Sequence, residues 1–167
     1  VLLLPGERIA EAARRALETK AGVQDANIAH LAEATVFDNP DRDPRGPTIS
    51  IVHAAVITGF EPGEDMMAAP VAESSGLPFD HDAIVARTAG NLLDALWVDQ
   101  GLTRALLGHE FTTADAARLT RDLTTAAGRP EADTSNLGRT LARVPHLVKA
   151  EARPAGRGRP AAGWSWL

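Results

Sequence analysis

Residues 6–23, which read GERIAEAARRALETKAGV, predict an amphipathic helix, and they decide how the first part of the chain is interpreted. Its apolar side chains recur at helical spacing, at Ile9, Ala12, Ala13, Ala16 and Leu17. Glu7 and Glu11 lie near the expected start, where negative charge suits the helix dipole, and Gly22 is a typical C-terminal stop. Taken alone, the stretch fits an ordinary helix that packs one face on a core.

The same stretch also resembles a Nudix box, whose pattern is G-x5-E-x7-R-E-U-x-E-E-x-G-U, where U is a bulky apolar residue. Glu7 and Arg15 are eight positions apart, as in that pattern. Its apolar and glycine positions are also in register, at Leu17, Gly22 and Val23. The leading glycine of the box would fall at or just before Val1. Because a Nudix fold places several strands ahead of this helix, we expect those strands upstream of Val1.

The acidic positions of the pattern hold Ala16, Thr19 and Lys20 instead. Positions i, i+3 and i+4 share one face of a helix, so three glutamates there would converge on one Mg²⁺ or Mn²⁺ ion. A methyl group, a hydroxyl and an ammonium cannot hold that ion, and the histidines have no metal-ligand spacing. We therefore predict no metal site, no catalytic residues and no resident cofactor.

Composition and charge predict a protein of two modules. Of the 167 residues, 44% are hydrophobic, which is enough for a core, and there is no cysteine. No apolar run approaches the roughly 20 residues of a membrane span, so a cytoplasmic protein is expected. Residues 1–100 carry 7 Lys/Arg against 16 Asp/Glu, whereas residues 101–167 carry 10 against 6. We predict an acidic module over residues 1–98 and a basic module over residues 99–167.

The acidic module is expected to be mixed α/β. After the first helix we predict a strand over 30–40, a loop over 38–47, a buried strand over 48–60, an irregular segment over 61–78 and a helix over 79–97. The strand over 48–60 is predicted to be buried because its sequence, TISIVHAAVITGF, is β-branched and nearly continuously apolar.

The basic module follows the element order of a winged helix. We predict helices over 102–108, 112–128 and 133–144, followed by a hairpin over 147–167 with the turn AGRGRP at its tip. Leu137, Leu141 and Val144 are expected to face the core. Trp164 and Trp166 are interpreted as core residues of the hairpin rather than as base-stacking residues.

The polar face of that third helix predicts binding to double-stranded DNA. Arginine suits guanine edges and phosphates, and asparagine can pair with adenine. The candidate DNA-binding residues are Thr134, Ser135, Asn136, Arg139 and Arg143 on this segment, Arg118 and Arg121 on the second helix, and Arg157 and Arg159 in the hairpin tip. The alternative is a small helical bundle with an exposed polar face and no nucleic-acid partner.

Together these segments resemble the Nudix-related transcriptional regulators of NAD metabolism, the NrtR family. The resemblance rests on the altered box, on the loop over 38–46, which is similar to a DPDRDPRG segment, on Phe79-Asp80-His81, on Phe111-Thr112 and on Gly158-Arg159-Pro160. It implies a Nudix-like α/β/α sandwich followed by a C-terminal winged helix-turn-helix. It also implies a homodimeric repressor of NAD biosynthesis or salvage genes that binds a palindromic operator and senses ADP-ribose or a related nucleotide.

Candidate effector-binding residues follow from that resemblance. They are Arg15, Lys20, Arg42 and Arg45. Lys20 could contact a phosphate as a point charge. Arg42 and Arg45 could contact the nucleotide or pair with Asp41 and Asp43 within the loop. Two other functions stay open: an active Nudix hydrolase of ADP-ribose, and a protein-interaction module whose basic part binds an acidic partner.

Overall fold

The computed structural model describes residues 1–64, 66–150 and 162–167. The chain forms two compact units, Val1–Thr88 and Ala89–Leu167, which we describe separately. The boundary between them falls within the helix α2 (His81–Ala95), ten residues before the predicted division between residues 98 and 99. The division into a sensor module and a DNA-binding module stays a prediction.

The first helix of the chain forms at the predicted place. It is α1 (Ile9–Ala21), and the Glu11 carboxylate accepts a hydrogen bond from the Arg8 backbone N–H at its start, at 2.9 Å. At its end Gly22 adopts a left-handed conformation, with φ 65°, and its N–H bonds to the Glu18 carbonyl at 3.0 Å. Glycine suits this position because it has no Cβ to clash in that conformation.

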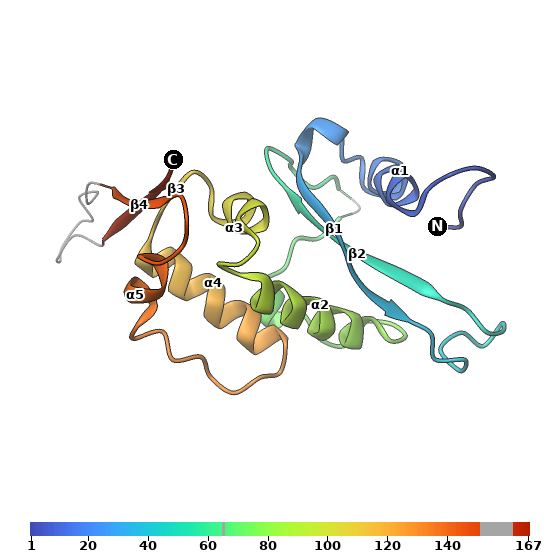
Figure 1. Cartoon of the computed structure of the whole chain (residues 1–167). Helices are drawn as coiled ribbons and strands as arrows, with labels where there is room; N and C mark the ends of the chain where they lie inside the picture. Colours follow the sequence, from blue (N-terminus) through green and yellow to red (C-terminus); the bar gives the residue numbers. More distant parts are fainter. Residues whose placement is uncertain (65, 151–161) are drawn as a thin grey trace. The chain divides into compact units, whose positions relative to one another are not determined.

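Two antiparallel strands follow, as the sequence predicts. They are β1 (Ile28–Phe37) and β2 (Ser50–Ile57), joined by the 38–49 connection, and Figure 1 shows α1 running beside them. Short 3-10 turns lie at Asp25–Asn27 and Val71–Glu73. The prediction of a buried second strand is wrong in degree, because every residue of β2 is half-buried. Within the described part of the chain this sheet has two strands, which leaves β2 incompletely covered.

The second unit contains a small sheet and a set of helices. After α2 come α3 (Gln100–Leu107), β3 (Glu110–Thr112), α4 (Thr113–Ala126), α5 (Leu137–Leu141), β4 (Leu147–Ala150) and β5 (Gly163–Trp166). The three strands are antiparallel in the order β3-β5-β4. In Figure 1 this sheet and α5 lie at the same end of α4. The predicted hairpin tip lies outside the described residues.

The helix α5 is much shorter than the predicted helix over 133–144. The Asp133 carboxylate accepts a hydrogen bond from the Ser135 N–H at 2.9 Å, and the Leu137 N–H bonds to the Thr134 carbonyl at 3.2 Å. Such side-chain bonds favour a turn over a helix. Thr134 and Ser135 therefore lie in a turn, and Asn136 occupies the N-cap position without a capping hydrogen bond from its side chain.

The core of the second unit confirms the predicted inward faces. Its buried members are Phe111, Ala116, Leu137, Leu141, Val144, Leu147, Trp164 and Trp166. The two tryptophans are buried, so their interpretation as core residues is confirmed. The indole N–H of Trp164 also donates to the Thr113 hydroxyl at 2.9 Å, which ties β5 to the start of α4. A reciprocal cap between Thr112 and Asp115 fixes the same helix end.

None of the helices in the described residues is both long and apolar enough to cross a membrane.

Candidate functional site

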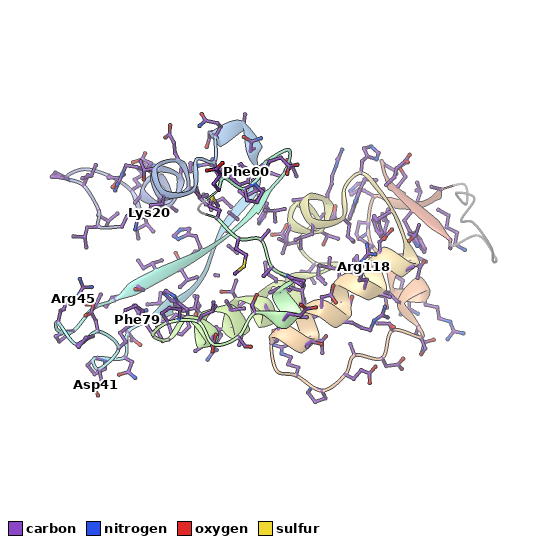
Figure 2. All side chains as sticks on the ribbon, turned by 180° about the vertical axis from the view of Figure 1, so that it is seen from behind. Lys20, Asp41, Arg45, Phe60, Phe79 and Arg118 are labelled. Atoms are coloured by element: carbon purple, nitrogen blue, oxygen red, sulfur yellow. The ribbon has the colours of Figure 1, made fainter. Side chains whose placement is uncertain are left out.

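The first unit contains a cavity of about 1300 Å³, which places three of the four predicted effector-binding residues together. One wall is the apolar stripe of α1, from Ile9 to Lys20, and the other wall comes from residues 42–55 and 79–81. Lys20, Arg42 and Arg45 line this cavity, whereas Arg15 does not. Figure 2 labels Lys20 on α1, Arg45 on the 38–49 connection and Phe79 just before α2.

Lys20 stands where the Nudix pattern has a glutamate, and it lines the cavity. Ala16 lines it as well, but the Thr19 hydroxyl instead donates to the Arg15 carbonyl at 2.7 Å. Among residues 1–64, 66–150 and 162–167, no carboxylate pairs with Lys20 and no group of three metal-ligating side chains comes together. Lys20 is thus an exposed cation at the cavity with no carboxylate partner among the described residues.

Arg15 is occupied in holding the segment before α1. Its guanidinium contacts both carboxylate oxygens of Glu7, at 2.7 and 2.8 Å, and donates to the Leu2 carbonyl at 2.9 Å. The Leu4 N–H also donates to Glu7, at 2.8 Å. These bonds, that from Arg15 first, lower the pKa of Glu7 to about 2. The Glu7–Arg15 spacing that the sequence picked out thus corresponds to an ion pair outside the cavity lining.

Arg42 is held even more firmly, and its side chain is only 10% exposed. It contacts both carboxylate oxygens of Asp80, at 2.9 and 3.1 Å, donates to the Ser50 hydroxyl, and lies 5.9 Å from the centre of the Phe37 ring. Hydrogen bonding to Arg42 lowers the pKa of Asp80 below its usual range. We predicted Asp41 and Asp43 as possible partners for this arginine, but the partner is Asp80, which lies 38 residues away in the sequence. Arg42 thus ties the 38–49 connection to the start of α2.

Arg45 pairs with Asp43, which is one of the pairings predicted within the loop. Its guanidinium contacts both oxygens of Asp43, at 2.9 and 2.7 Å, and this contact lowers the pKa of Asp43 to about 2. The Arg45 side chain is 88% exposed, so this pair lies at the rim of the cavity. The Asp43 side chain is only 18% exposed, so the solvent-facing member of this pair is the Arg45 guanidinium.

The second unit presents most of the predicted DNA-binding residues on its surface. Ser135, Asn136, Arg139 and Arg143 are exposed, opposite the buried Leu137 and Leu141. Thr134 is half-buried, and its hydroxyl accepts from Arg121 at 3.4 Å. Arg118 pairs with Asp115 at 2.9 Å. Arg157 and Arg159 lie outside the described residues.

A shallow hollow of about 420 Å³ in this surface includes a cation that the sequence reasoning missed. Ser135, Asn136 and Arg139 line it together with Lys149 of β4. In β4, Leu147 is buried and the following Val148 and Lys149 are exposed. Lys149 pairs across the sheet with Trp164, whose burial fixes the strand that carries it. Lys149 therefore extends the basic surface from α5 onto the sheet.

The fold described above is similar to that of solved Nudix proteins. A MutT/nudix family protein from Enterococcus faecalis matches 99% of this chain and 72% of its own, with a TM-score of 0.61 and 18% sequence identity. Two structures of NrtR from Shewanella oneidensis, one of them complexed with a 27mer DNA, each match 99% of this chain and 77% of theirs. Their TM-scores are 0.63, with 17% and 18% identity. The resemblance to the Nudix-related regulators is thus confirmed at the level of the fold.

A sequence relative supports the same relationship. An ADP-ribose pyrophosphatase from Methanocaldococcus jannaschii is 35% identical over 85 residues, which are 48% of this chain and 48% of that protein. The match thus spans about half the length of that relative. No protein-family model matches the chain.

Proposed function

We propose that this protein is a transcriptional repressor whose second unit binds double-stranded DNA and whose first unit senses a nucleotide without hydrolysing it. The observation that carries the proposal is the division of one short segment into two faces. Leu137 and Leu141 are buried in the core, while Arg139 and Arg143 are exposed on the other side. The DNA complex of the structurally similar NrtR supports this assignment.

In this proposal the second unit is a winged helix-turn-helix. Along the chain the second unit has the order α3, β3, α4, α5, β4 and β5, and its sheet has the order β3-β5-β4. Both orders are those expected of this motif. Base contacts come from Asn136, Arg139 and Arg143, with Thr134 and Ser135 beside them, while Arg118, Arg121, Arg157 and Arg159 contact phosphates or the minor groove. A homodimer would place two such units on a palindromic operator. The regulated genes would be those of NAD biosynthesis or salvage, and the protein would act in the cytoplasm.

The first unit would bind ADP-ribose or a related nucleotide through Lys20, Arg42 and Arg45, with Arg15 positioning the segment before α1. A sensor requires different affinities for the ligand in two states and does not require turnover. The loss of carboxylates at Ala16, Thr19 and Lys20 is compatible with that role. Hydrolysis of a diphosphate needs a divalent cation at that face, and an ammonium group repels the cation.

The DNA-binding part of the proposal is tested by fluorescence anisotropy with duplexes from the protein's own promoter region and a shuffled duplex of equal length. We expect selective binding that weakens steeply with salt, because phosphate contacts release counterions. Equal affinity for both duplexes, or no dependence on salt, would contradict it.

A second candidate is a Nudix hydrolase of ADP-ribose, which the match to an ADP-ribose pyrophosphatase favours. Incubation of the purified protein with ADP-ribose and Mg²⁺ or Mn²⁺ separates the two. Sustained release of AMP and ribose 5-phosphate would support the hydrolase, whereas binding without turnover would support the sensor.

A further inference from the structure

Phe79 combines two features that are unfavourable for a phenylalanine. Its side chain is 81% exposed, and its φ is 59°, in the left-handed region. A bulky residue in that region is an outlier, and such outliers concentrate at ligand-binding sites. Trp97 has a similar φ of 69°, but its ring is half-buried and stacks on Phe111 at 6.4 Å between ring centroids. Packing therefore explains Trp97 and does not explain Phe79.

Polar contacts on both sides hold Phe79 in this position. The Asp82 carboxylate accepts hydrogen bonds from the backbone N–H groups of Gly76 and Leu77, at 3.0 and 2.9 Å. Directly after Phe79, Asp80 is fixed by its two contacts with Arg42. The backbone on either side of Phe79 is thus held by hydrogen bonds of Asp80 and Asp82.

The ring itself has little covering. Within the described residues its one aromatic contact is edge-on with His81, at 6.0 Å between ring centroids. Phe79 nevertheless lines the cavity of the first unit, together with Lys20, Arg45 and His53. The residues that line the cavity therefore include an exposed aromatic ring and a lysine that forms no ion pair within the part of the chain that the structure describes.

We propose that Phe79 is the stacking platform for the heterocyclic base of a nucleotide, whose phosphates are attracted to Lys20. An aromatic face binds any base through its π-surface, and an ammonium binds phosphate as a point charge. The inference rests on the proposed nucleotide-sensing function and adds the group that recognises the base. An exposed phenylalanine could instead pack on another protein chain, which the experiment below distinguishes.

The test compares binding of ADP-ribose and of ribose 5-phosphate, which lacks the base, by isothermal titration calorimetry. Phe79→Asn removes the ring while asparagine tolerates the left-handed backbone. It should lower the affinity for ADP-ribose about five- to a hundredfold and leave the affinity for ribose 5-phosphate unchanged. Phe79→Trp, which keeps a ring, should retain the affinity for ADP-ribose. Lys20→Ala should lower the affinity for both ligands. Val98→Asn, at an exposed valine of the second unit (80% exposed), is the matched control and should change neither.

Several results would overturn the inference. Unchanged ADP-ribose affinity in Phe79→Asn would refute stacking and leave the sensing function intact. Equal weakening of both ligands would refute selective stacking on the base, because ribose 5-phosphate has no base to stack. If the unsubstituted protein binds no ADP-ribose, the sensing function fails and the inference fails with it. Loss of self-association in Phe79→Asn, measured by analytical ultracentrifugation, with ADP-ribose binding unchanged, would assign the ring to a protein contact.

Discussion

Replacing Leu141 with alanine should unfold the second unit at a much lower temperature. Leu141 has no exposed surface and lies in the core formed with Phe111, Ala116 and the two tryptophans of β5. Truncation of a fully buried leucine costs about 2–5 kcal/mol, through lost burial and the cavity that remains. In a unit of this size each kcal/mol lowers the midpoint of thermal unfolding by about 4–8 °C, so we expect a decrease of at least about 8 °C.

The chain provides a specific probe for this experiment. All three tryptophans, Trp97, Trp164 and Trp166, belong to the second unit, so intrinsic fluorescence reports its unfolding. Arg143→Ala is the control, because it truncates an exposed residue near Leu141, and its stability should change by no more than about 0.5 kcal/mol. Arg143→Ala should instead weaken DNA binding. If Leu141→Ala were no less stable than Arg143→Ala, the division of this segment into a core face and a DNA face would be wrong.

Three further predictions address other parts of the molecule. Arg121→Ala should reduce the slope of log affinity for DNA against log salt by about 0.9 for each bound chain, if its guanidinium neutralises one phosphate; an unchanged slope would remove it from the backbone contacts. Glu7→Gln should lower the urea midpoint at pH 7, measured by far-UV circular dichroism, since the ion pair with Arg15 stabilises the fold while Glu7 is ionised. Because the pKa of Glu7 is lowered from 4.5 to about 2, that stabilisation is lost as the pH falls through this range, and the difference should shrink by pH 3; a constant difference would argue against the ion pair. Gly22→Ala should destabilise the protein by about 1–2 kcal/mol in a urea titration, although no atom lies within 4 Å of the added Cβ, because φ is 65°; no change would mean that the helix ends differently.

Local patterns were sufficient to predict most elements of this fold. The α1 helix and its glycine stop, the two strands after it and the inward face of the third helix all follow from residue spacing, because each depends on neighbours a few positions away. The length of α5 could not be predicted in this way, since one hydrogen bond from Ser135 to the Asp133 carboxylate replaces a turn of helix.

The candidate site was less accessible to sequence reasoning. Lys20 and Arg45 were identified because the pattern or the loop composition marks them. The pairing of Arg42 with Asp80 was missed because it joins segments 38 residues apart. Phe79 was part of the family resemblance, but its exposure and backbone strain are properties of the fold. Lys149 was missed because a lone lysine on a short strand resembles any solvated residue.

The most direct test of the proposed repressor is to titrate its complex with promoter DNA with ADP-ribose, using anisotropy of the labelled duplex. The proposal predicts selective binding that ADP-ribose progressively releases, with the Lys20→Ala variant bound equally well but released only at higher ligand concentration. Selective binding that ADP-ribose does not alter in the unsubstituted protein, or no selective binding at all, would contradict the coupling of a nucleotide sensor to a DNA-binding unit.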